Sequence, residues 1–347
     1  MRRRFGKILM MGVLALLGLP ALSAAADPAT GKRPWRILHV MSYETNFDWS
    51  DDQFAGFKLG FGRNLNVEYK LFALDAKRND SLESVTARAR EARQLISDWQ
   101  PDLLYVSDDA AVEHVLKHYA NTALPCVFSG MNRSVAYYGL GAAKNVTGAL
   151  EQEMFIETIR LLQQIKPGAR RIHLISDRAS YWTESIERIE KLAKTAGGMM
   201  LVGVDRLERY EDFQRTVLGN PHEADAYLLL GVFNYKDAQG HDVPFKALQQ
   251  WVAENSRIPD VSFWADRIKH GTLAGVAVSS LDQGRKAGLA ARQILIEGRS
   301  PASIPVEVTR KGIASVSIAR ARSLGITPRA SVLLTSQVSP EYAWATQ

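Results

Sequence analysis

Residues 102–128 read DLLYVSDDAAVEHVLKHYANTALPCVF. The apolar run at 102–106 predicts a buried strand, residues 109–119 suit a helix, and the apolar run at 125–128 predicts a second strand. Two strands separated by one helix within so short a stretch indicate a βαβ unit, whose strands pair in parallel. This unit decides the class of the fold.

The same alternation continues on both sides of this unit. Before it, predicted strands at 36–41 and 67–74 alternate with predicted helices at 51–63 and 81–99. After it, an extended segment at 145–150 leads into a second array. This array has a predicted helix at 151–165, predicted strands at 171–176, 200–204, 226–230, 261–264 and 273–278, and helices between the strands. We therefore predict an α/β fold of two doubly wound parallel-sheet lobes joined by a hinge.

The length of the chain supports this division. A single hydrophobic core rarely grows beyond about 250–300 residues, and the chain has 347. We expect residues 36–145 plus 274–298 in lobe 1 and residues 146–272 plus 301–347 in lobe 2. The hinge segments are expected near 145–148, 271–273 and 298–304.

The first 26 residues have the pattern of a cleaved signal peptide. Arg2, Arg3, Arg4 and Lys7 precede the apolar stretch Ile8–Leu19, and small residues follow at 23–26. The apolar stretch is shorter than the ~20 residues that span a bilayer. No cysteine follows it, so no lipid attachment is expected. We predict a periplasmic protein, secreted with removal of residues 1–26.

Charge and cysteine content exclude several classes of protein. The formal net charge of the chain is +6, and loss of the four basic leader residues lowers it to +2. So small a charge gives no electrostatic reason to bind nucleic acid. The one cysteine, Cys126, forms no internal disulfide and lies in an apolar strand, as a small buried hydrophobe does.

The usual sequence signals of catalysis and metal binding are missing. No G-x-S-x-G elbow, P-loop or G-x-G-x-x-G after a strand occurs. His114 and His118 lie four apart, but no third ligand pattern accompanies them, and a solvated helix face explains them equally. We expect no enzymatic activity, no metal and no cofactor.

The segments that follow the predicted strands are where a ligand is expected. In open α/β sheets, ligands bind beyond the carboxyl ends of the strands. Small hydroxyl, Asn, Asp and aromatic residues recur in these segments, at 42–50, 107–111, 129–133, 176–182, 231–235, 262–266 and 279–282. Aromatic faces with a few polar groups suit a small organic solute.

Each of these residues also has a structural interpretation. Ser107, Ser129, Ser176 and either Asp108 or Asp109 are equally suited to cap the following helix. Tyr43, Trp182 and Trp264 are candidates for lining the site, and burial in the core is the alternative for each. The aromatic pair Tyr181 and Trp182 begins a helix, where burial needs a special reason.

Five short motifs resemble one protein family. They are LPCVFSGMN at 124–132, KNVTG at 144–148, LLQQIKPGARRI at 161–172, DQGRKAGLAARQILIEG at 282–298 and ARSLGI at 321–326. In this order they resemble the ABC-transporter substrate-binding proteins of the tryptophan/tyrosine type, which have the type I periplasmic binding fold. The resemblance runs from about Arg36 to the end of the chain.

The resemblance implies a monomer that closes two lobes on a small organic solute, such as an amino acid or another aromatic compound, and delivers it to an ABC permease. It implies solute contacts at Tyr43, Asp108, Ser129, Asn132, Asp177, Tyr181, Asn234 and Asp282, to which the aromatic pattern adds Trp182 and Trp264. Asp108 or Asp282 would hold an ammonium group. Two alternatives stay open: a periplasmic ligand-sensing subunit that docks on a membrane sensor kinase or cyclase, and an extracytoplasmic enzyme.

Overall fold

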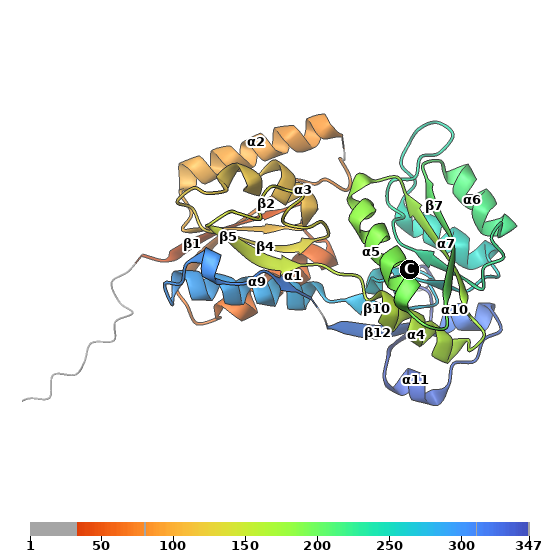
Figure 1. Cartoon of the computed structure of the whole chain (residues 1–347). Helices are drawn as coiled ribbons and strands as arrows, with labels where there is room; N and C mark the ends of the chain where they lie inside the picture. Colours follow the sequence, from red (N-terminus) through yellow and green to blue (C-terminus); the bar gives the residue numbers. More distant parts are fainter. Residues whose placement is uncertain (1–32, 80, 310, 346–347) are drawn as a thin grey trace, which may run out of the picture. The chain divides into compact units, whose positions relative to one another are not determined.

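The computed structural model describes residues 33–79, 81–309 and 311–345, and the chain from Trp35 onward forms one compact unit (Figure 1). The expected signal peptide, residues 1–26, lies outside the described residues. Among the described helices, none combines the length and the apolar character that crossing a bilayer requires.

The first sheet contains six parallel strands in the order β11-β5-β4-β3-β1-β2. Their bounds are β1 Trp35–Met41, β2 Val67–Ala73, β3 Leu103–Ser107, β4 Cys126–Met131, β5 Val146–Leu150 and β11 Glu307–Val308. Helices α2 (Leu82–Trp99) and α3 (Asp108–His114) cover one face, and α1 (Asp48–Phe61) and α9 (Ser280–Leu295) cover the other (Figure 1). Alternate residues of each strand enter the two cores: Leu38 and Leu104 face α2, whereas Ile37 and Leu103 face α1.

The second sheet contains seven strands in the order β13-β12-β10-β9-β8-β6-β7. Their bounds are β6 Arg171–Asp177, β7 Met200–Leu207, β8 Ala226–Leu229, β9 Asp260–Val261, β10 Ala274–Val278, β12 Gly312–Ser317 and β13 Gln337–Ser339. Only the β10–β12 pair is antiparallel among the described pairs. The sheet is therefore dominated by parallel pairing, as the sequence predicts.

Helices cover both faces of the second sheet. One core contains residues of α4 (Phe155–Ile165) and α5 (Thr183–Thr195), and the other contains residues of α6 (Tyr210–Gly219) and α7 (Phe245–Asn255). The remaining helical elements are short: α8 Ala265–Lys269, α10 Ile318–Ser323, α11 Ala330–Leu334 and the 3-10 turns Leu116–Tyr119, Ser180–Trp182 and Pro301–Ser303. The predicted α/β fold class with two sheets is confirmed.

Sheet membership differs from the expected division at three strands. β5 and β11 pair in the first sheet and β10 pairs in the second, although we expected residues 146–150 and 307–308 in lobe 2 and residues 274–278 in lobe 1. The chain passes between the sheets after β5, between β10 and α9, and between β11 and β12. Each passage lies one strand later than expected, because a short apolar run predicts a buried strand but not the sheet in which it pairs.

Two helices differ from the prediction. The helix expected at 109–119 ends at His114, because Val115 leaves helical geometry at φ −125° and a 3-10 turn follows. His114 and His118 therefore do not share one regular helix face. The helix expected from residue 151 begins at Phe155, since Glu151–Met154 carry the chain from the first sheet to the second.

The contact between α1 and α9 depends on four glycines, Gly56 and Gly60 on α1 and Gly284 and Gly288 on α9. A Cβ atom at Gly56 would lie 2.1 Å from the carbonyl oxygen of Leu281, and a Cβ at Gly288 would lie 2.1 Å from that of Phe57. The two helix backbones are thus in direct contact. This contact joins residues 280–295 to the first sheet.

We predict that Gly288→Ala lowers the free energy of unfolding by about 2–3 kcal/mol, because the added methyl group forces two helix backbones apart. Urea unfolding of the purified protein measures this change. Gly219→Ala is the matched control, since Gly219 is also helical and a Cβ there meets no atom within 4 Å. Its stability should stay equal or rise, as alanine favours a helix over glycine. Equal stability of both variants would contradict the close contact.

Candidate functional site

Ten side chains at the carboxyl ends of strands from both sheets form what we call the polar–aromatic cluster. The first sheet contributes Tyr43 after β1, Lys77 after β2, Asp108 and Asp109 after β3, and Glu151 after β5. The second sheet contributes Tyr181 after β6, Phe233 and Asn234 after β8, and Trp264 and Arg267 after β9.

Contacts within the cluster connect the two sheets. The Lys77 ammonium lies 4.4 Å from the centroid of the Phe233 ring, and Trp264 Nε1 donates a hydrogen bond to Glu151 Oε1 at 3.0 Å. Close by, the backbone N–H of Ser134 donates to Glu184 Oε2 at 2.7 Å. The carboxyl ends of the two sheets therefore face each other across this cluster.

Asp108 begins α3 in an unusual backbone conformation, with φ at +66°. Its Oδ1 accepts hydrogen bonds from Trp49 Nε1 at 2.9 Å and Gln53 Nε2 at 3.4 Å, whereas Oδ2 is buried without a hydrogen-bond partner. Burial raises the pKa of Asp108 to about 7. A left-handed backbone and an unpartnered carboxylate oxygen both cost free energy, as is common at binding sites.

Lys77 extends from the first sheet into a group of aromatic rings. Its ammonium lies 4.2 Å from the Tyr43 ring, 4.0 Å from the Phe47 ring and 4.4 Å from the Phe233 ring. Burial lowers the pKa of Lys77 to about 8, although Asp266 and Asp108 oppose this effect. The rings attract the ammonium by cation–π interaction, which compensates only in part for the hydration that the ammonium loses on burial.

Arg267 lies on the short helix α8 and is fully buried. Its Nε, Nη1 and Nη2 atoms all lack a hydrogen-bond partner. Three rings surround the guanidinium carbon, those of Phe233 at 4.3 Å, Trp264 at 5.1 Å and Phe245 at 5.7 Å. The cluster thus contains a buried cation whose donors are unused.

Glu151 and Asp177 are two further buried carboxyl groups at this edge. Burial raises the pKa of Glu151 well above its usual range, and the charges of Asp108 and Glu153 add to this effect. Asp177 Oδ1 accepts the N–H of Ala179, and Oδ2 accepts the N–H groups of Phe233 and Asn234 at 3.0 and 3.3 Å. Asp177 therefore fixes the two loops that carry Tyr181 and Phe233.

Several sequence-predicted residues meet in or beside the cluster. Tyr43, Asp108, Tyr181, Asn234 and Trp264 are members, and Asn234 Nδ2 donates to the Tyr181 hydroxyl at 2.8 Å. Asn132 lies at its border, where its N–H and Nδ2 both donate to Asp109 Oδ2. Its own Oδ1 is buried without a partner.

Three sequence-predicted residues are not members of the cluster. The Ser129 hydroxyl lies 2.8 Å from that of Tyr105 inside the first sheet's core. Trp182 packs in the second sheet's core directly beside the cluster: its ring centroid lies 4.8 Å from that of Tyr181 and 5.6 Å from that of Trp264, and its Nε1 atom is buried without a hydrogen-bond partner. Asp282 forms an ion pair with Arg285 on α9 at 2.8 Å.

The sequence did not identify Lys77, Asp109, Glu151, Phe233 or Arg267 as site residues, and it indicated Asp109 only as a candidate helix cap. Phe233 falls inside a strand-end segment that the sequence marks, and Glu151 directly follows a predicted strand. Lys77 follows the second strand, and the sequence pattern does not mark the end of that strand. Arg267 lies one residue beyond the marked segment 262–266, and only the fold shows that it is buried.

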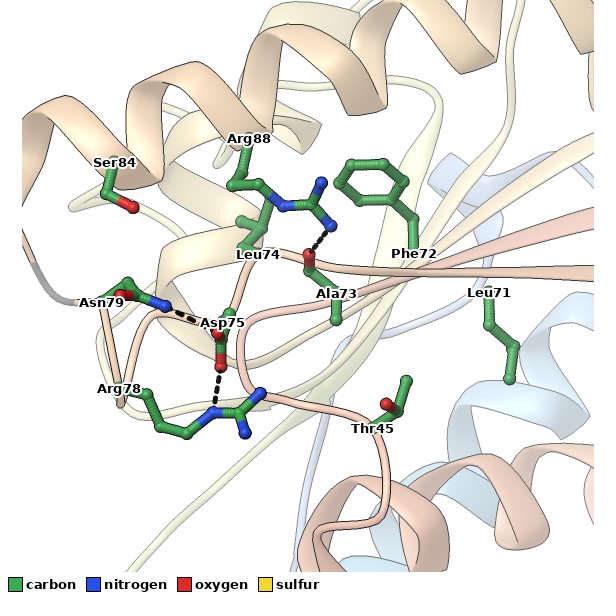
Figure 2. Close-up of a pocket in the computed structure, with 10 residues that line it drawn as sticks. All are labelled: Thr45, Leu71, Phe72, Ala73, Leu74, Asp75, Arg78, Asn79, Ser84 and Arg88. Carbon is green, nitrogen blue, oxygen red and sulfur yellow. Dashed lines mark hydrogen bonds and ion pairs between the residues drawn. The ribbon is translucent and has the colours of Figure 1, made fainter.

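Two surface hollows lie outside the cluster. Figure 2 shows the one beside the end of β2, with a volume of about 410 Å³, where Arg88 Nη2 donates to the Ala73 carbonyl and Asp75 accepts from Arg78 and Asn79. The other, of about 470 Å³, is lined by Asp282, Lys311 and Ser279 among others. Neither contains a member of the polar–aromatic cluster.

His173, Asp205 and His222 are the residues whose types and spacing suit a metal ion within the described chain. Their donor atoms lie within 4.8 Å of one another. His173 Nε2 and Asp205 Oδ2 are 2.9 Å apart, the distance of an ordinary hydrogen bond, which accounts for that pair without a metal.

The fold is shared with solved structures of low sequence identity. A Streptococcus pneumonia structure, described as an ABC domain in complex with L-Trp, has a TM-score of 0.68 at 19% identity and covers 88% of this chain and 99% of its own. A Clostridium difficile substrate-binding protein with adhesive properties has a TM-score of 0.65 at 16% identity, with coverages of 88% and 98%. No curated protein sequence matches the chain significantly.

A periplasmic ribose ABC transporter protein from Conexibacter woesei has the same architecture, with a TM-score of 0.54 at 13% identity and coverages of 84% and 94%. These likenesses identify the two-sheet architecture as the type I periplasmic binding fold. The model of the family described as ABC transporter substrate binding protein matches residues 54–338. Because this match spans most of the sequence, the chain belongs to the ABC transporter substrate-binding protein family.

Proposed function

We propose that this protein binds a small organic solute at the polar–aromatic cluster and delivers it to an ABC permease. The observation that carries the proposal is the pair of unpartnered buried groups in the cluster, Asp108 Oδ2 from the first sheet and the Arg267 guanidinium from the second. Buried polar groups normally have partners. A solute held by both groups would supply those partners and join the two sheets.

The side chains of the cluster suit distinct parts of such a solute. The rings of Tyr43, Tyr181 and Trp264 would contact its apolar body, and Asn234 and Asp108 would bind polar groups. Asp177 and Asn132 would act indirectly, because their hydrogen bonds position Phe233, Asn234 and Asp109. Trp182 and Ser129 belong to the cores that support the two halves of the site.

Access to the cluster would require the two sheets to separate. The cluster side chains contact one another, as Lys77 contacts Phe233 and Trp264 contacts Glu151. The three passages of the chain between the sheets, after β5, after β10 and after β11, would be the hinge. Rotation at a few such residues is the common way in which two-lobed proteins close on a ligand.

The proposal includes the path of the protein to its site of action. Residues 1–26 would direct export and be removed, and the mature protein would act in the periplasm as a monomer that docks on its permease. Relatives with the same fold are described with L-Trp and with myo-inositol bound, so both compounds belong in a first ligand screen.

We predict that a binding solute raises the melting temperature of the protein, by an amount equivalent to about 2.7 kcal/mol at a ligand concentration of 100 times Kd. Differential scanning fluorimetry against L-tryptophan, other amino acids, aromatic acids and myo-inositol measures it. Tyr43→Ala should weaken the effect, whereas Tyr342→Ala, near the carboxyl terminus, should retain it. Equal responses of the two variants would place the site elsewhere.

Delivery is tested by uptake of the identified solute in cells that lack the gene. Uptake should fall and should return with the wild-type gene but not with the Tyr43→Ala gene. Unchanged uptake with loss of a transcriptional response to the solute would support a sensory role and contradict delivery to a permease.

The pKa of Asp108 gives a prediction about pH. Because burial raises this pKa from 3.8 to about 7, the folded protein binds more protons than the unfolded chain between these values. Stability then falls as pH rises through this range. Asp108→Asn removes the group, so the free energy of unfolding of this variant relative to wild type, measured by urea unfolding at each pH, should increase from pH 4 to pH 7 by up to about 1.4 kcal/mol per pH unit.

Asp225→Asn is the control for this measurement. Burial opposes but does not outweigh the hydrogen bonds from the N–H groups of Arg170 and Arg171, which lower the pKa of Asp225, so this carboxyl group titrates below about pH 5 in the folded and the unfolded chain. The stability difference between Asp225→Asn and wild type should be constant between about pH 5 and pH 7. A difference for Asp108→Asn that is equally constant would contradict the raised pKa.

A further inference from the structure

Two arginines are fully buried among the described residues, and their surroundings differ completely. Arg320 Nε donates to Asp260 Oδ1 at 2.9 Å, Nη1 donates to the carbonyls of Ala253 and Ser256, and Nη2 donates to that of Ile258. Arg320 is thus a structural residue with its charge and donors matched. Arg267 has no hydrogen bond to any of its three nitrogens.

A buried guanidinium without partners is costly. Breaking the pairing of a buried charge typically destabilises a protein by several kcal/mol, because the remaining charge has lost its water. The aromatic rings around Arg267 recover part of this energy but accept no conventional hydrogen bonds. An apolar residue at position 267 would therefore stabilise the fold at least as well as Arg267 does. Stability does not explain why this position is an arginine.

The carboxylates that act on Arg267 do not form a hydrogen bond or ion pair with its guanidinium. Asp177 and Asp266 both act on the charge of Arg267 through space. The oxygens of Asp177 already accept backbone N–H groups. Asp266 is not within the 4.0 Å of an ion pair with any nitrogen of Arg267. The donors of Arg267 are available to a group from outside the chain.

The geometry around Arg267 restricts what that group is. A guanidinium is planar, and its N–H donors match the two oxygens of a carboxylate in the same plane. Phe233 and Trp264 lie within cation–π distance of the guanidinium, so an apolar body attached to the carboxylate would meet aromatic surface. The Lys77 ammonium, on the same Phe233 ring, adds positive charge.

We propose that Arg267 binds the carboxylate of the solute, and that the solute is a small carboxylic acid with an apolar or aromatic body. This inference rests on the proposed function, and it adds the residue and the chemical class that decide recognition. Acids bind through the Arg267 fork, whereas the matching amides leave the guanidinium unpaired and bind weakly.

The experiment compares acids with their amides on wild type, Arg267→Met and Arg320→Met. The probes are L-tryptophan, L-phenylalanine and 3-phenylpropionate, each with its primary amide, and tryptamine as an amine without a carboxylate. Calorimetric titration gives the affinities. Wild type should bind at least one acid, and should bind it at least about thirtyfold more tightly than its amide, and Arg267→Met should lose this preference.

The melting temperatures without ligand separate a binding role from a structural one. Arg267→Met should melt at the same or a higher temperature than wild type, because the change removes an unpaired buried charge. Arg320→Met should melt at a clearly lower temperature, because it leaves Asp260 and three backbone carbonyls without their donor. A fall for Arg267→Met as large as that for Arg320→Met would overturn the proposal.

The other outcomes also decide. If amides or tryptamine bind as tightly as the acids, solute binding stands and the carboxylate inference fails. The inference also fails if an acid binds Arg267→Met as tightly as wild type, or if no acid of this set binds while other solutes of the ligand screen do. If no compound of either set binds wild type, the proposed function fails together with the inference.

Discussion

Parallel pairing of strands is the constraint on which the polar–aromatic cluster depends. Strands that run in one direction bring the loops after them to one edge of the sheet, and in this protein two such edges face each other. Side chains as distant in sequence as Tyr43 and Trp264 thereby enter one cluster. The one antiparallel pair among the described strands, β10–β12, lies outside this arrangement. It returns the chain to the second sheet without adding a loop to the cluster.

The way in which the chain passes between the sheets follows from the same constraint. Three passages connect the sheets, and after the second one α9 must pack on the first sheet. The glycines of α1 and α9 allow the two helices to pack closely over the core that contains Phe57 and Ala287. A rigid α1–α9 pair supports Gln53 and Trp49, which bind Asp108. Helix packing at one face of the sheet therefore sets the position of a charged group at its edge.

The sequence predicted the fold well because its signals are local. Apolar runs such as 103–106 and the spacing of Ala89, Ala92 and Ile96 indicate strands and helices without knowledge of their partners. The sheet to which β5 and β10 belong depends on long-range pairing, which these runs do not encode. The strand-end rule located Tyr43, Asp108 and Trp264 for the same local reason.

The sequence could not distinguish which strand-end residues face the other sheet. Asp177 and Asp108 both follow strands and look alike in sequence, yet backbone N–H groups occupy the oxygens of Asp177, while one oxygen of Asp108 has no partner. Arg320 and Arg267 differ in the same way, because the guanidinium of Arg320 has hydrogen-bond partners and that of Arg267 has none. Whether a polar group is satisfied depends on atoms supplied by distant segments, and only the folded chain shows them.

The distribution of matched and unmatched charge separates the parts that hold the fold together from the part that we propose binds a ligand. Arg320 and Asp260 tie α10 to β9, and all three nitrogens of the Arg320 guanidinium donate hydrogen bonds within the protein. Arg267 and Asp108 instead have buried polar atoms without partners at the edge where the sheets meet, and the Lys77 ammonium lies there against three aromatic rings. The cores of the two sheets supply the stability that allows this. Folding has already removed water from these groups and fixed their positions. A solute that pairs with them therefore gains binding energy without that cost, which is the physical basis of preorganised recognition.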